Sequence, residues 1–432
     1  MPPANLQPLP QRPIEQRPTP QQRPTPQQLA WQRDGMGVFI HVGLNTFHDL
    51  EWSDGTLPAA SFNPTALDAD QWVRTAKLAG ARYVVLTAKH HDGFCLWPTR
   101  TTEYSVKNSP WRGGEGNLVA EVRAACDRHG LAYGLYLSPW DRNADCYGDE
   151  AAYDEFYLAQ LTELLSGYGD LHEIWFDGAG SDGHTYDWAR IMAVVDDLQP
   201  NAMVFNMGRP TIRWVGNEDG VAADPVVYVA RGTALSNYTD AALDLNADVY
   251  LPPECDVSIR PGWFWHADER PRSLADLMYI HDRSLGLGAG LLLNLPPDDR
   301  GLIPDEDVTR VQEWTDALQR RFADRFDATV TPVDGGTMLT FASPVTIDAL
   351  WLHEQLEDGQ QIFEHRVWAG DGVAATQGVT QRAVLAAEGR ELAHGGTVGV
   401  RRLHQFDPVT VSQVVVRHEA GTIESASGHL SR

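Results

Sequence analysis

Two acidic residues, Asp177 and Glu218, stand where short apolar stretches of the chain end, and together they could cleave a glycosidic bond. Asp177 closes the stretch IWF and is followed by a glycine, and Glu218 lies in WVGNEDG. Glycoside hydrolysis needs two carboxyl groups: one attacks or stabilises the anomeric carbon, and the other protonates the leaving oxygen. A turn or capping aspartate and a solvated loop glutamate are the structural alternatives, and the spacing alone leaves them open.

A second group of chemically useful residues is histidines. The stretch TAKHHDGFCLWPT places His90, His91 and Asp92 directly after the apolar run YVVLTA, and His41 follows MGVFI. A neutral imidazole donates from one nitrogen and accepts at the other, which suits neighbouring sugar hydroxyls. A histidine satisfied within the core is the alternative. A zinc site is disfavoured, because adjacent residues at a strand end do not easily reach one ion and no H-x-x-x-H or H-E-x-x-H spacing occurs.

The elements that must position these residues alternate between strands and helices. Short β-branched or aromatic runs are predicted as strands at 36–42, 81–88, 132–138, 172–177, 202–206, 212–216 and 290–295. Amphipathic segments at 67–80, 117–130 and 153–169 are predicted as helices. This alternation is typical of a parallel sheet, and it predicts an α/β fold, a (β/α)8-like TIM barrel with its eighth strand within 221–265. The candidate residues would then meet at the carboxyl ends of the strands.

Regions on either side of the predicted barrel differ from it in composition. Residues 1–28 are rich in Pro and Gln and repeat the string RPTPQQ, which favours an extended, solvated tail. The barrel is expected to span 29–322 and to close with a helix at 305–322. Residues 323–432 lack long helical periodicity and alternate between apolar and polar residues, so they predict a separate C-terminal antiparallel β-sandwich.

The charge and hydropathy of the chain limit the classes of partner and the location that we expect for it. Asp and Glu total 59 against 34 Lys and Arg, a formal net charge of −25, which disfavours nucleic acid and anionic membrane surfaces as partners. The first residues contain no apolar core of a secretory signal and no run is long enough to span a membrane, so a cytoplasmic location is expected. The four cysteines lack C-x-x-C spacing, which favours reduced structural thiols.

Several strings together resemble one enzyme family. VFIHVG, TAKHHDGF, IWFDG, WVGNE and LLLNLPPDDRGLIP resemble, in this order, the α-L-fucosidases of glycoside hydrolase family 29, over roughly residues 26–320. EWSDG, FNPTALDADQWV, HHDGFCLWPT and YLSPWDRN are similar to the subgroup that acts on α-1,3 and α-1,4 fucosides of branched, Lewis-type structures. The resemblance implies a retaining hydrolase of fucosylated oligosaccharides that uses double displacement and has neither a metal nor an organic cofactor.

The resemblance also implies roles for individual residues. Asp177 matches the nucleophile and Glu218 the acid/base. The residues expected to bind the sugar are His41, Glu51, Trp52, His90, His91, Tyr136 and Trp265, with Trp263 as an alternative to Trp265. One departure is Val42, where an aromatic residue is frequent in the family. A retaining barrel glycosidase for another sugar and a catalytically silent carbohydrate-binding protein remain the alternative functions.

Overall fold

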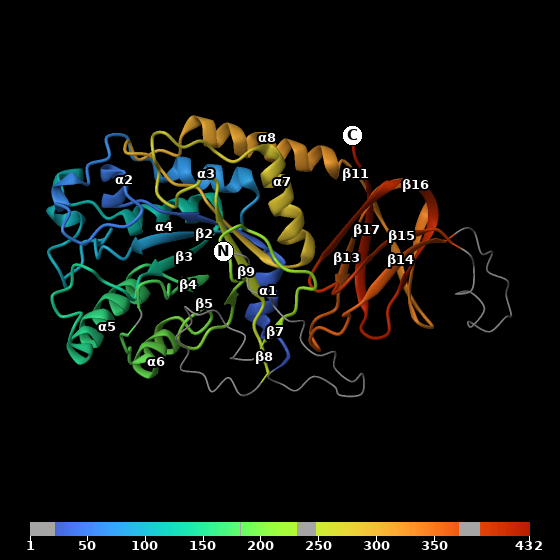
Figure 1. Cartoon of the computed structure of the whole chain (residues 1–432), viewed down its shortest axis with the longest axis horizontal. Helices are drawn as coiled ribbons and strands as arrows, with labels where there is room; N and C mark the ends of the chain where they lie inside the picture. The colour runs from blue at the N-terminus through green and yellow to red at the C-terminus, as the bar shows by residue number, and fades with distance from the viewer. Residues whose placement is uncertain (1–21, 182, 231–247, 371–388) are drawn as a thin grey trace.

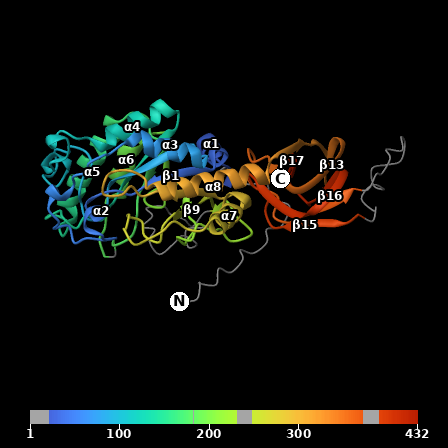
Figure 2. The same cartoon turned by 90° about the horizontal axis from the view of Figure 1, so that it is seen from above.

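The chain folds into two parts that follow one another along its long axis (Figure 1). The computed structural model describes residues 22–181, 183–230, 248–370 and 389–432. A ring of parallel strands covered by helices comes first, and an antiparallel β domain follows. Seen from above, helix α8 (Asp305–Arg321) runs along the first part and ends beside the second (Figure 2). The first 21 residues of the expected N-terminal tail lie outside the described residues.

Eight parallel strands form a nearly closed barrel, as predicted. They are β1 (Met36–Ile40), β2 (Tyr83–Lys89), β3 (Ala132–Leu137), β4 (Glu173–Trp175), β5 (Met203–Phe205), β6 (Arg213–Trp214), β9 (Pro253–Ser258) and β10 (Gly290–Asn294). Their order is β5-β4-β3-β2-β1-β10-β9-β6, and a single bridge between Phe205 and Ile212 joins the two ends of this order. β9 is the strand that the sequence placed within 221–265.

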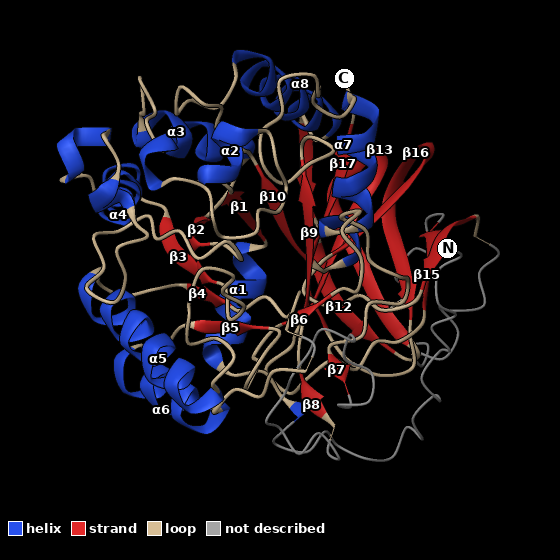
Figure 3. Cartoon of the chain, turned by 60° about the vertical axis from the view of Figure 1, so that its left-hand side comes forward, coloured by secondary structure: helices blue, strands red, loops and turns tan. Residues whose placement is uncertain are grey.

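Helices cover the outside of this barrel, and Figure 3 shows α3 to α6 outside strands β1 to β5. Besides α8, the α-helices of the first part are α1 (Pro26–Asp34), α2 (Leu44–His48), α3 (Ala69–Ala79), α4 (Leu118–His129), α5 (Glu150–Gly167), α6 (Trp188–Leu198) and α7 (Leu274–Arg283). Polar caps set two of their starts. Asp149 accepts a hydrogen bond from the Ala152 N–H, so α5 begins before the predicted residue 153. Thr25 and Gln28 form a capping box, so α1 begins within the expected tail.

The C-terminal part is an antiparallel sheet domain, as expected. Its strands are β11 (Asp324–Asp327), β12 (Thr329–Val333), β13 (Gly336–Glu354), β14 (His365–Gly370), β15 (Glu391–Gly395), β16 (Arg402–Arg417) and β17 (Ile423–Leu430). They follow the order β11-β17-β13-β16-β14-β15, with β12 paired to β13. This domain has its own apolar core, which includes Leu350, Val367 and Val414. A two-stranded sheet, β7 (Val229–Ala230) with β8 (Val249–Tyr250), lies before β9.

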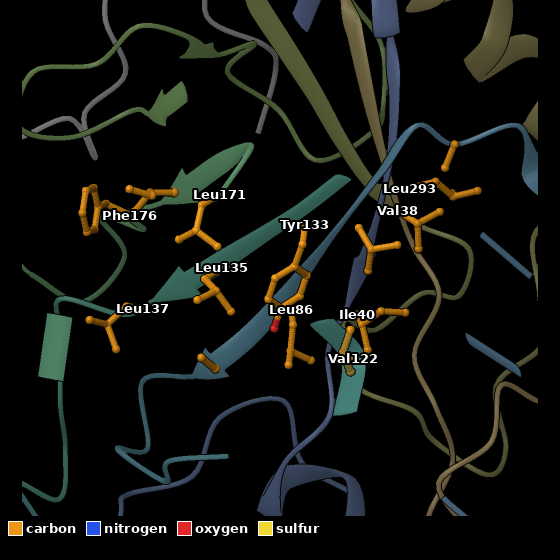
Figure 4. Close-up of a cluster of buried hydrophobic side chains, with 14 of the residues drawn as sticks. Val38, Ile40, Leu86, Val122, Tyr133, Leu135, Leu137, Leu171, Phe176 and Leu293 are labelled. Carbon is orange, nitrogen blue, oxygen red and sulfur yellow. The ribbon is translucent and has the colours of Figure 1, made fainter. Parts of the chain in front are cut away.

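Side-chain alternation along the barrel strands separates two cores. Val38 and Ile40 of β1 belong to the outer cluster between strands and helices, which also contains Leu86 and Val122 (Figure 4). Phe39, between them, belongs to the cluster inside the barrel. Successive residues of a strand point to opposite faces, so His41, the residue directly after β1, takes the next inward position. The strand pattern therefore carries a histidine to the inner end of the barrel.

The barrel interior also encloses two carboxyl groups. Glu173 of β4 and Glu254 of β9 are completely buried and interact electrostatically with each other. The indole of Trp31 donates to Glu173 at 3.0 Å, and Tyr83 and Trp175 donate to Glu254 at 2.8 and 3.1 Å. Burial raises the pKa of both carboxyls above the usual range, so their protonated forms are favoured in the folded chain.

In the described part of the chain, no helix is both long enough and apolar enough to cross a membrane. Its four cysteines, Cys95, Cys126, Cys146 and Cys255, form no disulfide, as the sequence predicted.

Candidate active site

Asp177 lies two residues beyond the end of β4, and two hydrogen bonds orient its carboxylate. The Tyr136 hydroxyl donates to Oδ2 at 3.1 Å, and the Ala179 N–H donates to Oδ1 at 2.9 Å. His91 Nε2 lies 3.6 Å from Oδ2. The side chain remains 27% exposed, so the carboxylate is held in place and still accessible. This combination suits a nucleophile that must approach a bound molecule.

Hydrogen bonds fix the orientation of the His91 ring. Ser138 Oγ lies 2.7 Å from His91 Nδ1 and donates its own proton to the Trp140 carbonyl, 2.7 Å away. Ser138 therefore accepts the proton on Nδ1, and Nε2 of the neutral ring is left as an acceptor beside Asp177. Burial lowers the pKa of His91 despite the opposing attraction of Asp177, which favours this neutral form.

His41 is a second neutral imidazole with an assigned tautomer. The Asn294 amide donates to Ser258 Oγ at 2.9 Å and to the Trp263 carbonyl at 2.8 Å, which leaves its oxygen to accept from His41 Nδ1 at 2.9 Å. Burial lowers the pKa of His41 to about 3. Nε2 of His41 is thus an acceptor at neutral pH.

His90 lies between these two histidines. Its ring centroid is 5.7 Å from that of His41 and 4.2 Å from that of His91. Burial lowers its pKa well below the ordinary value. Its Nδ1 is buried and, within the described residues, has no hydrogen-bond partner. A buried polar atom without a partner is costly, so a ligand hydroxyl is the natural group to satisfy it.

Aromatic rings surround the histidine cluster. Tyr136 stacks on His90 at 5.7 Å with an interplanar angle of 12°, and Trp263 lies 5.2 Å from His41. Phe264 lies 5.0 Å from His90, edge to face. Within the described residues, Trp265 makes no ring contact with this cluster, so Trp263 is the tryptophan of the pair that adjoins it. Sequence reasoning did not single out Phe264, although it lies between the two tryptophans of GWFWH.

Glu51 and Trp52 reach the site in different ways. Both carboxylate oxygens of Glu51 accept backbone N–H groups, from Trp263 at 2.9 Å and from Phe264 at 3.0 Å, and His266 Nε2 lies 2.8 Å away. Glu51 therefore holds the loop that carries these rings. The Trp52 side chain is half exposed, and its ring lies 5.3 Å from that of His91 at the border of the site.

Glu218 lies beyond β6, in a turn shaped by Asn217, whose side chain accepts from the Asp219 N–H at 3.1 Å and donates to the Val221 carbonyl at 2.9 Å. The Glu218 side chain is exposed, but surrounding atoms still desolvate it in part. This desolvation raises its pKa, repulsion from Asp177 and Glu51 adds to the effect, and a hydrogen bond with Trp263 opposes it. Glu218 and Asp177 thus interact electrostatically, and the protonated form of Glu218 is favoured beside Asp177.

These contacts unite most of the sequence candidates. His41, His90, His91, Tyr136 and Asp177 form one connected cluster, Glu218 interacts with it electrostatically, and Glu51 and Trp52 flank it. Among the residues that the structure describes, no three histidine, cysteine, aspartate or glutamate side chains gather in a way that could hold a metal ion. The arrangement orients the Asp177 carboxylate, favours the protonated form of Glu218 and offers several neutral histidine nitrogens to hydroxyl groups.

Known proteins are similar to this chain in sequence and in fold. The family model described as Alpha-L-fucosidase matches residues 46–321. Alpha-L-fucosidase 1 of Arabidopsis thaliana is 45% identical over 304 residues, which is 68% of this chain and 60% of the plant protein. The solved structure of SpGH29 has a TM-score of 0.82 at 33% identity and covers 95% of this chain and 98% of its own. A Ruminococcus gnavus GH29 fucosidase in complex with fucose has a TM-score of 0.81 at 26% identity, with 95% of each chain covered.

Proposed function

The chain belongs to the α-L-fucosidase family, GH29, and is therefore a glycoside hydrolase; we propose that it is a retaining, exo-acting enzyme that releases terminal α-1,3- or α-1,4-linked fucose from branched, Lewis-type oligosaccharides. The observation that carries the proposal is the oriented Asp177 carboxylate beside three neutral histidines, with Glu218 in electrostatic contact. Residues 29–322 would form the catalytic barrel and residues 323–432 an accessory domain.

In the first step Asp177 attacks the anomeric carbon of fucose. The bond between this carbon and the leaving oxygen breaks, and Glu218 transfers its proton to that oxygen. The products of this step are a fucosyl ester on Asp177, the released sugar and an ionised Glu218. The hydrogen bonds from Tyr136 and the Ala179 N–H keep the attacking carboxylate in a single orientation.

In the second step water cleaves the ester. Because Asp177 is no longer negatively charged, the repulsion that raised the pKa of Glu218 disappears and Glu218 can act as a base. It removes a proton from water, the water oxygen bonds to the anomeric carbon, and the ester bond breaks to restore Asp177. Two inversions at one carbon leave the released fucose with its original anomeric configuration.

Recognition of fucose would combine nitrogens with apolar faces. The acceptor nitrogens of His41 and His91 and the unpartnered Nδ1 of His90 can bind ring hydroxyls. Phe264 and Trp263 can pack against the C–H groups and the 6-methyl group. An apolar wall at this methyl should favour fucose over galactose by about 1–3 kcal/mol.

The linkage preference rests on motifs near the exposed border of the site. Trp52 of EWSDG and Trp140 of YLSPWDRN lie 5.5 Å apart, ring to ring. Arg142 lies over the Trp140 ring at 5.1 Å and donates to the Ser53 carbonyl at 2.7 Å, which ties the two motifs together. This aromatic border supports contact with the sugars to which fucose is attached, because indole faces pack well on sugar rings.

Release of free fucose from a Lewis a or Lewis x trisaccharide, run beside 2′-fucosyllactose, tests the proposal. The expected result is release from the branched substrate, abolished in Asp177→Gly, with α-fucose as the first product seen by NMR. Release mainly from 2′-fucosyllactose would overturn the linkage preference. Binding without release from either substrate would favour the carbohydrate-binding alternative.

A further inference from the structure

Asp256 is a buried carboxyl group at the barrel mouth that the mechanism above does not use. Alternate residues of β9, namely Glu254, Asp256 and Ser258, face the barrel interior, while Cys255 and Val257 belong to the outer core. Asp256 therefore lies between the buried carboxyl pair below and Ser258, which holds the Asn294 amide at the mouth. Its side chain is 3% exposed.

A short hydrogen bond joins the Asp256 side chain to the strand that leads to Glu218. The Trp214 indole N–H donates to Asp256 Oδ1 at 2.7 Å. Trp214 is the last residue of β6, and Glu218 follows four residues later. β6 has only two residues, its ladder is with β9, at Arg213 and Trp214, and toward β5 there is a single bridge, between Phe205 and Ile212. A strand this short has few backbone contacts, so side-chain anchors decide how firmly its end is held.

Glu218 and Asp256 also interact electrostatically. Burial raises the pKa of Asp256 well above its usual value, repulsion from Glu218 and Glu254 adds to this, and the hydrogen bond from Trp214 opposes it. Burial and the neighbouring carboxylates therefore favour the neutral form of Asp256, which limits the negative charge beside Asp177 and Glu218. A neutral acid whose Oδ1 accepts from Trp214 is an anchor rather than a proton donor to substrate.

We propose that Asp256 is a positioning residue for the general acid: its hydrogen bond to Trp214 fixes the end of β6 and so places the Glu218 carboxyl against the leaving oxygen. The inference rests on the proposed roles of Asp177 and Glu218 and adds a residue to them. If this hydrogen bond is lost, protonation of the leaving group should weaken, while nucleophilic attack by Asp177 stays intact. The loss of activity should therefore depend on how much the leaving group needs a proton.

Leaving-group dependence tests this consequence. A sugar alcohol leaving from a Lewis x trisaccharide needs its proton, whereas 2-chloro-4-nitrophenol leaving from its α-L-fucoside needs little help. Trp214→Phe removes the N–H donor and keeps an aromatic ring. It should lower kcat/KM for the trisaccharide at least about tenfold more than for the aryl fucoside, as part of the 10²–10⁴-fold that general acid catalysis contributes.

Matched variants separate this role from general damage. Trp72→Phe removes another buried indole hydrogen bond, to the Gly301 carbonyl at 2.9 Å on the outside of the barrel, and should leave the ratio of the two substrates unchanged. Asp256→Ala should shift the ratio as Trp214→Phe does, and the double variant should shift it no further. Asp256→Asn should restore the ratio, because an amide oxygen still accepts from Trp214.

The inference would be overturned if Trp214→Phe lowered kcat/KM equally on both substrates, or if Trp72→Phe shifted the ratio of the two substrates as much as Trp214→Phe. In either case the proposed function would stand. A wild-type chain that releases fucose from neither substrate would overturn the proposed function and this inference with it. Thermal melts of each variant show whether the fold is kept, and Trp214→Phe carries the test if Asp256→Ala does not fold.

Discussion

The buried ion pair between Lys89 and Asp141 gives a sharp test of what holds the histidine loop in place. Lys89 Nζ lies 2.8 Å from Asp141 Oδ2, and the two side chains are 0% and 2% exposed. Asp141 Oδ1 also accepts the N–H groups of Asn143 and Ala144 at 3.0 and 2.9 Å. Lys89 ends β2 immediately before His90, so the pair ties the histidine loop to the loop beyond β3.

Lys89→Met leaves the Asp141 carboxylate buried without its partner charge. Breaking a buried pair in this way costs about 3–5 kcal/mol, because the remaining charge stays desolvated. The packing around Lys89 should survive, since the Tyr153 and Tyr157 rings that lie 5.9 and 5.4 Å from Nζ can contact a methionine equally well. We therefore expect a drop in the urea midpoint with little change in m-value.

Two further variants decide whether charge is the cause. Lys89→Met combined with Asp141→Asn should recover most of the loss, because the amide oxygen still accepts the two backbone N–H groups and no charge remains unpaired. Lys107→Met, which removes a lysine from a partly exposed pair with Glu103 at 3.0 Å and from a hydrogen bond to the Thr99 carbonyl, should cost only about 1–2 kcal/mol. The reasoning is refuted if Lys89→Met costs no more than Lys107→Met, or if the double variant is as unstable as the single one.

Three other predictions concern the buried carboxyls, the border of the site and the acid/base. Glu173 has a raised pKa, so between about pH 4.5 and that pKa the folded chain binds more protons than the unfolded chain, and the free energy of unfolding falls as the pH rises. Glu173→Gln should flatten this pH dependence in urea unfolding between about pH 5 and 8. An unchanged slope would contradict the prediction. Gly180 has φ +74, and a Cβ there would lie 1.8 Å from the Trp140 ring. Gly180→Ala should therefore lower the unfolding free energy by about 1–3 kcal/mol and, by displacing Trp140, raise KM for the trisaccharide. An unchanged KM would count against Trp140 as a sugar contact. Glu218→Gln should lower trisaccharide turnover about 10²–10⁴-fold, and azide should rescue cleavage of the aryl fucoside; full trisaccharide activity would remove Glu218 from the mechanism.

The barrel could be predicted from the sequence because seven of its strands are apolar or aromatic runs. β9 gave no such signal. Its sequence, PECDVS, carries Glu254 and Asp256 into the barrel interior, where indole and phenol donors satisfy them. Those donors come from strands about 40 to 170 residues away along the chain, so local periodicity has no access to them. Only the need for an eighth strand indicated β9.

The site was predictable as a set of residue types at strand ends, and less so as a set of contacts. Glu51 was expected to line the sugar site, but its oxygens hold the backbone of Trp263 and Phe264, more than two hundred residues away in sequence. The choice between Trp263 and Trp265 was equally open, because alternation does not apply in an irregular loop. The contacts of Glu51 with the Trp263 and Phe264 N–H groups hold this loop beside the histidines, and local sequence does not reveal them.

The weak join between β5 and β6 has a consequence for how the Asp177 and Glu218 carboxylates are held in the barrel. Asp177 follows a strand that is paired on both sides, to β3 and to β5, whereas β6, which leads to Glu218, has a ladder on one side and a single bridge on the other. The segment between β5 and β6 is held by loop contacts instead, because the Thr211 and Ile212 N–H groups donate to the Val204 carbonyl at 2.9 and 3.2 Å. The molecule thus holds Asp177 between two ladders, whereas Glu218 depends on one ladder and on the contacts of a single loop.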